Sequence, residues 1–129
     1  MALLVLDASV VIALLDARDI HHSRALASIE GSRADEKVIP AGAFAEVLVV
    51  PQRAGGRAVG EFERNLADVP VRIEPVTADI ARQAAALRAR HSALRLGDAL
   101  VLATGEILGA TVLTADRGWP RYSRRVRVI

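Results

Sequence analysis

The stretch that most constrains the fold is Leu3–Leu6, a short run in which every side chain is aliphatic. A strand that is apolar on both sides is typical of the centre of a parallel sheet, because helices cover both faces of such a sheet. Parallel strands also need long crossover connections, which are usually helical. The sequence therefore predicts an α/β fold with strand Leu3–Leu6 at its centre.

Short apolar or alternating runs recur along the chain, and helical patterns lie between them. The expected strands are Leu3–Leu6, Lys37–Ile39, Val71–Val76, Thr111–Thr114 and Val126–Ile129. The expected helices are Val10–Leu15 capped by Ser9, a helix from about Asp19 to Ile29, one from Pro40 to about Val50, Arg57–Ala67, Asp79–Arg90 capped by Thr77, and Gly97–Leu108 closed by Gly109. Pro51 is expected to end the third helix. This alternation favours a mainly parallel sheet of about five strands, covered on both faces.

The length of 129 residues fits a single domain spanning 1–129. Cysteine is absent, which excludes disulfides and cysteine-based zinc sites and is consistent with a reducing cytoplasm, where we expect the protein to act. The apolar start of the chain resembles a signal peptide, but no basic residue precedes it and Asp7 interrupts it. We therefore expect no signal peptide and no membrane association.

The basic residues are unusual, because Lys37 is the one lysine among seventeen Lys and Arg residues. Five arginines cluster near the C-terminus: Arg117, Arg121, Arg124, Arg125 and Arg127. Arginine donates paired hydrogen bonds to phosphate, so the cluster favours an anionic partner. The alternative is an arginine-rich surface without a binding role. Trp119 and Tyr122 lie among these arginines. Aromatic rings among basic residues can stack on unpaired bases. The alternative, which we favour for Trp119, is that the ring packs over the end of the sheet.

Two aspartates follow expected strands directly. Asp7 ends the strand Leu3–Leu6, and Asp116 follows Thr114-Ala115. In parallel sheets the functional site lies beyond the carboxyl ends of the strands, which is where both side chains are expected. Each aspartate taken alone is equally typical of a turn or a helix cap.

Two further acids lie on helices whose neighbouring residues are largely apolar. Glu46 is surrounded on its helix by glycine, alanine and valine, and Asp98 is followed on its helix by Val101 and Leu102. A buried carboxylate is costly unless it is paired or binds a metal ion. For Asp98 the alternatives are an ion pair with Arg95 or a first-turn acid that the helix dipole stabilises. Glu106 shares this apolar setting but need not share the pocket.

If these four carboxylates converge, they repel one another and either take up protons or recruit a cation. An all-oxygen site suits Mg²⁺ or Mn²⁺. Such a site activates water and polarises a phosphoryl oxygen, which points to phosphodiester hydrolysis.

The chain resembles the PIN-domain nucleases, and especially the VapC-type toxins of bacterial toxin–antitoxin pairs. The matching strings are Val5-Leu6-Asp7-Ala8-Ser9, Ala45-Glu46-Val47-Leu48, Leu96-Gly97-Asp98-Ala99-Leu100 and Leu113-Thr114-Ala115-Asp116. The resemblance covers essentially the whole chain, with all four motifs in the expected order. It implies a three-layer α/β/α sandwich around the parallel sheet.

The resemblance also implies a catalytic site. Mg²⁺ or Mn²⁺ would be held mainly by Asp7 and Asp98, with Glu46 and Asp116 completing the acidic pocket. Ser9 and Thr114 would steady the site through hydrogen bonds, although Ser9 is equally typical of a helix cap and Thr114 of a strand. Some PIN domains carry another acid two residues after the last aspartate, where this chain has Gly118. The resemblance therefore does not fix whether the site binds one metal ion or two.

The function that the resemblance implies is a metal-dependent endoribonuclease, assembled as a homodimer and inhibited by a small antitoxin protein. One alternative is a PIN-type nuclease with a housekeeping role in RNA processing. The other is a catalytically silent PIN-fold module that binds RNA or protein.

Overall fold

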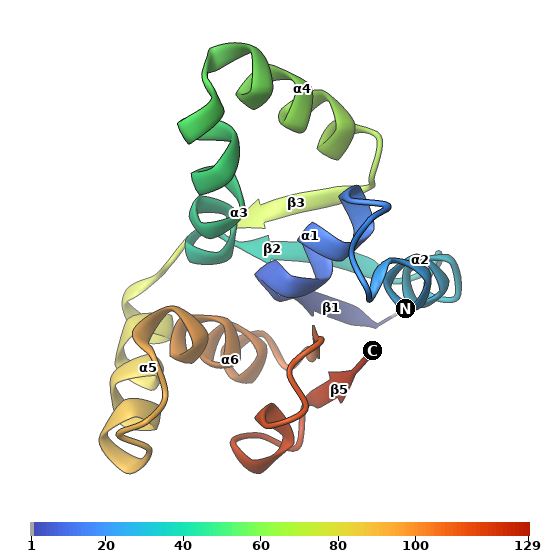
Figure 1. The fold of residues 1–129 in the computed structure, drawn as a ribbon. Helices are drawn as coiled ribbons and strands as arrows, with labels where there is room; N and C mark the ends of the chain where they lie inside the picture. Colours follow the sequence, from blue (N-terminus) through green and yellow to red (C-terminus); the bar gives the residue numbers. More distant parts are fainter. Residues whose placement is uncertain (1) are drawn as a thin grey trace.

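The computed structural model describes residues 2–129 and contains a five-stranded sheet in the order β3-β2-β1-β4-β5 (Figure 1). Its strands are β1 (Leu3–Leu6), β2 (Glu36–Pro40), β3 (Val71–Glu74), β4 (Thr111–Thr114) and β5 (Val126–Val128). Every neighbouring pair is parallel. The prediction of a parallel sheet with Leu3–Leu6 at its centre is confirmed.

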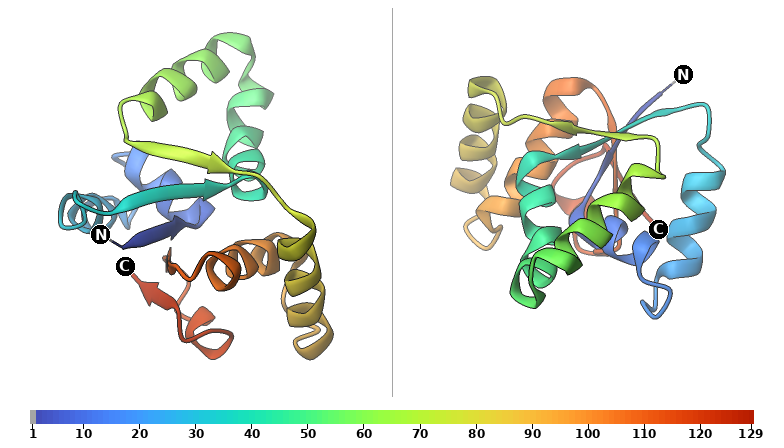
Figure 2. Two further views of the ribbon diagram at one scale, coloured as in Figure 1. Left: turned by 180° about the vertical axis from the view of Figure 1, so that it is seen from behind. Right: turned by 90° about the horizontal axis from the view of Figure 1, so that it is seen from above.

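Six helices connect the strands. They are α1 (Ala8–Leu15), α2 (His22–Glu30), α3 (Ala41–Ala54), α4 (Gly56–Ala67), α5 (Ala78–Arg90) and α6 (Leu96–Leu108), with a short 3-10 helix η1 (Trp119–Arg121) before β5. Right-handed crossovers from β1 to β2 and from β3 back to β4 place helices on opposite faces. Accordingly, α1 and α2 lie on one side of the sheet and α5 and α6 on the other (Figure 2). Helices α3 and α4 pack together as an arm beyond β3 (Figure 1).

The start of α1 differs from the prediction. The residue that caps this helix is Asp7, whose Oδ1 accepts a hydrogen bond of 2.8 Å from the Ala8 backbone N–H. Ser9 lies inside the first turn, and its hydroxyl donates to the Asp7 carboxylate instead. The prediction of Ser9 as the cap is therefore wrong, because the helix begins directly at the end of β1 without an intervening turn.

The end of α3 also differs from the prediction. The helix continues through Pro51 to Ala54 and stops at Gly55, whose φ of +117° favours glycine. Pro51 removes one backbone donor close to the end of the helix, and its carbonyl still accepts from the Gly55 N–H at 3.1 Å. The predicted ends of two other helices are confirmed: Thr77 caps α5, and Gly109 closes α6 in the left-handed conformation with φ of +64°.

The core is aliphatic, as the shortage of aromatic residues predicts. The strand residues Val5, Leu6, Val38, Ile39, Val112 and Leu113 are completely buried, and Leu102 of α6 lies against them. Trp119 is buried as well, and η1, which contains it, contacts β5, so this ring belongs to the core and is not an exposed platform for bases. No helix within residues 2–129 is long and apolar enough to cross a membrane.

Candidate acidic site

Asp7 is the acid held most firmly. It follows β1 at the carboxyl edge of the sheet and is 6% exposed. Its Oδ1 accepts from the Ala8 N–H, and its Oδ2 accepts from the hydroxyls of Ser9 and Thr114, each at 2.8 Å. Burial raises the pKa of Asp7, and these hydrogen bonds oppose the rise. The result is a carboxylate with a fixed orientation and a weakened preference for the charged form.

Ser9 and Thr114 also connect Asp7 to the segment that follows β4. The Ser9 hydroxyl accepts from the Ala115 N–H at 3.0 Å, and the Thr114 hydroxyl accepts from the Asp116 N–H at 3.1 Å. Strand β1 borders β2 on one side and β4 on the other, so the chain reverses its direction of winding between β1 and β4. Asp7 and Asp116 therefore flank the switch point, where ligands bind in open parallel sheets.

Asp98 lies in the first turn of α6 with 23% of its side chain exposed. Its pKa is raised by burial and by the negative charges of Asp7, Glu46 and Asp116, while Arg95 lowers it. The Arg95 Nε lies 3.8 Å from Asp98 Oδ2, but the Arg95 side chain is 88% exposed, so water screens this pair. The ion pair predicted as an alternative is therefore present, and it does not neutralise the site.

Glu46 corrects part of the sequence analysis. Helix α3 was expected to be apolar almost all round, yet Glu46 is exposed and so is Val50. The reason is that α3 extends with α4 beyond β3, so part of its surface faces solvent (Figure 1). The Glu46 carboxylate nevertheless points to the start of α6, because a Cβ atom on Gly97 would lie 3.4 Å from its Oε1. Glu46 thus borders the acidic site from the solvent side.

Asp116 is likewise exposed and not buried. Its Oδ1 accepts from the Gly118 N–H at 2.8 Å, which makes a local turn of the kind that sequence analysis named as the alternative. It also borders the same cavity as Asp98, which has a volume of about 190 Å³. The turn fixes the position of Asp116, which lies across the cavity from Asp98 of α6.

The cavity is also lined by residues that the sequence analysis did not single out and by an arginine of the C-terminal cluster. The turn between α5 and α6 contributes Ala93 and Leu94, and η1 contributes Arg121. One signal in the sequence pointed to this turn, since Arg95 lies three residues before Asp98 and also borders the cavity. Glu106 lies elsewhere: its carboxylate accepts from the Ser123 hydroxyl at 2.5 Å and lies 3.6 Å from Arg125 Nε.

The four acids form an electrostatic cluster and not a closed coordination shell. Within residues 2–129, no three Asp, Glu or His side chains lie close enough together to chelate one ion. The donor set is nonetheless all carboxylate oxygen, and Asp98 is influenced by the charges of the other three acids. That chemistry fits a hard divalent cation such as Mg²⁺ or Mn²⁺.

A comparison with protein families matches residues 4–125 to the PIN domain. This chain belongs to the PIN domain family. The matched span includes Asp7, Glu46, Asp98 and Asp116. A comparison with curated protein sequences finds no match.

Solved structures share the PIN fold of this chain at low sequence identity. A toxin–antitoxin complex from Klebsiella pneumoniae is 22% identical with a TM-score of 0.77, over 98% of this chain and 96% of that chain. The sarcin–ricin loop cleaving toxin VapC20 of Mycobacterium tuberculosis is 24% identical with a TM-score of 0.72, over 92% and 93%. FitAcB from Neisseria gonorrhoeae is 19% identical with a TM-score of 0.73, over 98% and 96%.

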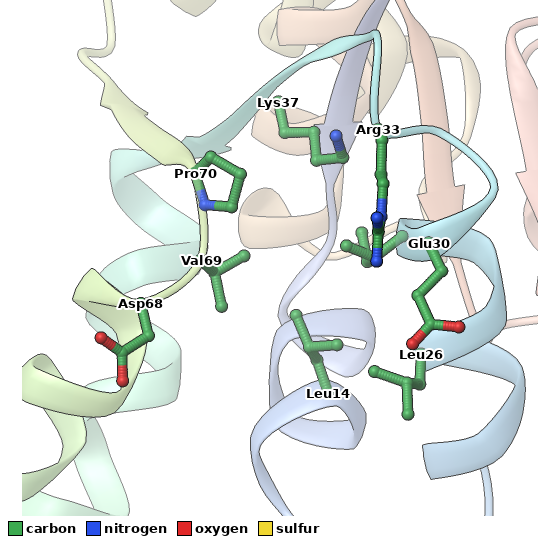
Figure 3. A pocket seen from close by; sticks show the side chains of 9 residues that line it. Leu14, Leu26, Glu30, Arg33, Lys37, Asp68, Val69 and Pro70 are labelled. Atoms are coloured by element: carbon green, nitrogen blue, oxygen red, sulfur yellow. The ribbon is translucent and has the colours of Figure 1, made fainter.

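A roomier cavity of this PIN domain, about 440 Å³, lies at the opposite edge of the sheet (Figure 3). Its walls are largely apolar and include Leu14, Leu26 and Val69. The Lys37 ammonium closes one side, where it donates to the carbonyls of Ser32 at 2.6 Å and Asp35 at 2.9 Å. These bonds satisfy a buried charge and secure the turn before β2, so we assign this lysine a structural role.

Proposed function

We propose that this PIN domain is a divalent-metal-dependent endoribonuclease and the toxin of a toxin–antitoxin pair. The observation that carries the proposal is the environment of Asp98, whose pKa is raised by burial and by Asp7, Glu46 and Asp116. Carboxylates that repel one another beyond the ends of parallel strands are unfavourable for stability alone and are useful for holding a cation. A solved toxin with this fold cleaves the sarcin–ricin loop, which supports an RNA substrate.

In this proposal, Asp7 and Asp98 hold Mg²⁺ or Mn²⁺, and Glu46 and Asp116 complete the acidic pocket. A bound divalent cation would polarise the scissile phosphate and lower the pKa of a water molecule. Asp7 contributes rigidity, because three hydrogen bonds fix its carboxylate. Ser9 and Thr114 act through Asp7 as positioning residues. Asp98 would ligate the ion from the side of α6, opposite Asp116 across the cavity that both residues border.

An antitoxin partner is supported by an apolar groove beside Glu46. The groove has a volume of about 280 Å³ and lies between α1, α3 and α4, with Glu46 at its border. Ile12 and Val50, which both line the groove, are 42% and 70% exposed, and with Phe62 and Leu15 they form one contiguous apolar surface. We propose that an apolar segment of the antitoxin binds this groove and covers Glu46. Solved structures of this fold include toxin–antitoxin complexes, which supports such a partner.

The nuclease proposal is tested by incubating total cellular RNA with the purified protein in Mn²⁺ and in EDTA. Discrete fragments are expected with Mn²⁺ only. Asp98→Asn is expected to reduce cleavage by at least about a hundredfold, since it removes one metal ligand. The matched control is Asp79→Asn, an exposed aspartate on α5 that pairs with Arg82. Intact RNA under every condition would contradict the proposal.

Metal binding is tested without reference to activity by thermal unfolding in Mn²⁺. An ion that binds the native state raises the melting temperature. The rise is expected for the parent and for Asp79→Asn, and it is expected to be absent for Asp98→Asn. A parent whose melting temperature does not respond to Mn²⁺ would point to the silent binding module.

The toxin role and the oligomeric state need separate tests. Expression of the parent in a bacterial host is expected to stop growth, whereas Asp98→Asn is expected to be tolerated. Growth that continues during active cleavage would favour the housekeeping nuclease. We propose a homodimer in the cytoplasm, and light scattering of the purified protein would measure its mass directly.

A further inference from the structure

We infer that a groove leading away from the acidic site past Arg121 and Tyr122 to His91 binds single-stranded RNA next to the cleaved bond. This inference rests on the proposed ribonuclease function, because it assigns the path of that substrate. The groove is formed by η1, the residue that follows it, and the turn between α5 and α6. These elements are distant in sequence and contain none of the four acids.

The groove is continuous with the acidic site. Two adjoining cavities share Ala93, Arg121 and Tyr122. The first, of about 190 Å³, contains Asp98 and Asp116, and the second, of about 320 Å³, extends to Arg90 and His91. A strand bound at the acids can therefore continue along these residues without leaving the surface.

The charge of the groove suits a phosphate backbone. Arg121 is exposed and borders both cavities, and Arg95 and Arg90 lie at the two ends. No salt bridge involves Arg121 or Arg90 in the part of the chain that the structure describes. Arg125, from the same C-terminal cluster, is instead paired with Glu106. Arginines without an acidic partner, next to an acidic site, can neutralise the phosphates of a substrate that the acids alone would repel.

The groove also offers aromatic surface for bases. The Tyr122 and His91 rings meet edge to face with their centroids 5.0 Å apart. The Arg121 guanidinium lies over the Tyr122 ring, 4.8 Å from its centroid, so the ring orients the arginine. Aromatic rings and guanidinium planes are platforms on which unpaired bases stack. Duplex RNA hides its base faces, so this combination favours a single strand.

One contact holds the wall of the groove in place. Arg88 Nε donates to the Leu94 carbonyl at 2.8 Å across the turn between α5 and α6. Leu94 itself is buried, which anchors this turn to the core. The wall is therefore preorganised, which reduces the entropy lost when a strand binds.

The inference is tested by fluorescence anisotropy with a labelled single-stranded RNA of about ten nucleotides. All proteins carry Asp98→Asn, so that the probe stays intact. Arg121→Ala is expected to weaken binding about tenfold and to lower the slope of log affinity against log salt by about one. Tyr122→Ala is expected to weaken binding about tenfold, and Tyr122→Phe about twofold or less, because the ring remains.

The matched control is Arg124→Ala, an exposed arginine of the same segment that borders neither cavity. It is expected to change affinity less than about threefold, a non-specific electrostatic effect. Circular dichroism melts confirm that each variant is folded. Duplex RNA and single-stranded DNA of the same sequence are the comparison probes. Tighter binding of single-stranded RNA than of the duplex supports the inference. Binding of the single-stranded DNA that also depends on Arg121 and Tyr122 supports it as well, and would show that the groove recognises phosphates and bases without the 2′-hydroxyl group.

The inference and the proposed function fail in different ways. Parent-like affinity and salt slope in both Arg121→Ala and Tyr122→Ala would overturn the groove, even if the parent cleaves RNA. A failure of the Asp98→Asn protein to bind single-stranded RNA, or equal affinity for the duplex, would overturn it as well. If binding depends on both residues but the parent, with Asp98 intact, cleaves no RNA in Mn²⁺, the groove is supported and the nuclease is rejected.

Discussion

The Thr114 hydroxyl donates a hydrogen bond of 2.8 Å to Oδ2 of Asp7 and joins two residues that are 107 positions apart. Both side chains are buried at the carboxyl edge of adjacent strands. The bond ties the orientation of the central acid to the end of β4, and it partly compensates for the burial of the carboxylate.

Thr114→Val keeps the shape of the side chain and removes this donor. We expect it to lower the free energy of unfolding by about 1–3 kcal/mol, since a buried carboxylate loses a partner. RNA cleavage should fall about 10–100-fold because Asp7 loses its fixed orientation. Urea denaturation and cleavage assays measure the two effects. Thr114→Ser retains the hydroxyl and should behave almost as the parent, so an equal loss in both variants would contradict this role.

The raised pKa of Asp98 predicts a pH-dependent stability for the metal-free protein. The folded state binds this proton more tightly than the unfolded state, for which 3.8 is the ordinary value. The contribution of Asp98 to the free energy of unfolding is therefore greatest below 3.8 and falls as pH rises through the raised folded pKa. Asp98→Asn does not titrate, so its stability relative to the parent should increase from mildly acidic to neutral pH.

The measurement for this prediction is urea denaturation in EDTA across that pH range. Asp79→Asn is the control, because its exposed carboxylate pairs with Arg82 outside the site. A difference between Asp98→Asn and the parent that stays constant with pH would show that the Asp98 pKa is not raised by folding. The same variant should lose RNA cleavage, so stability and activity would change in opposite directions.

Gly55 and Gly56 form a matched pair at the junction of α3 and α4. A Cβ atom would meet nothing within 4 Å at either position, but Gly55 has a φ of +117°. Gly55→Ala should therefore destabilise the fold by about 1–3 kcal/mol through backbone strain. Gly56→Ala, in the first turn of α4, should be neutral or stabilise by up to about 1 kcal/mol. Equal melting temperatures for the two variants would contradict the assignment of strain to Gly55.

Gly105 permits the close approach of α6 to the sheet. A Cβ atom there would overlap Val112 Cγ2 of β4 and lie 3.5 Å from the Ala110 carbonyl oxygen. Gly105→Ala gains about 1 kcal/mol in helix propensity, yet overpacking costs about 1–3 kcal/mol or more. We expect a net loss of stability. In the double variant with Val112→Ala, the two losses should be less than additive by at least about 0.5 kcal/mol. Strict additivity in denaturation experiments would exclude the clash.

The local pattern of the sequence determined most of the fold. Aliphatic runs predicted the central strands β1 and β4, because a strand buried on both faces needs apolar residues at nearly every position. Alternating apolar and charged residues predicted the edge strands β3 and β5, which are partly exposed. Thr77 and Gly109 marked two helix ends correctly, since capping depends on neighbouring backbone groups. Pro51 led to a wrong end for α3. A proline near the end of a helix removes only one backbone hydrogen bond, and Gly55 is the residue that ends the helix.

The tertiary structure alone decided how each acid is used. The sequence identified Asp7, Glu46, Asp98 and Asp116 as candidates, but it presented Glu46 as buried when it is exposed. Burial depends on which elements pack over a helix, and residues near in sequence do not report it. The sequence also could not predict the hydrogen bond between Thr114 and Asp7, or the cavities that Arg121 lines together with the turn after α5. Each joins segments that are far apart in the sequence and become neighbours only in the folded sheet.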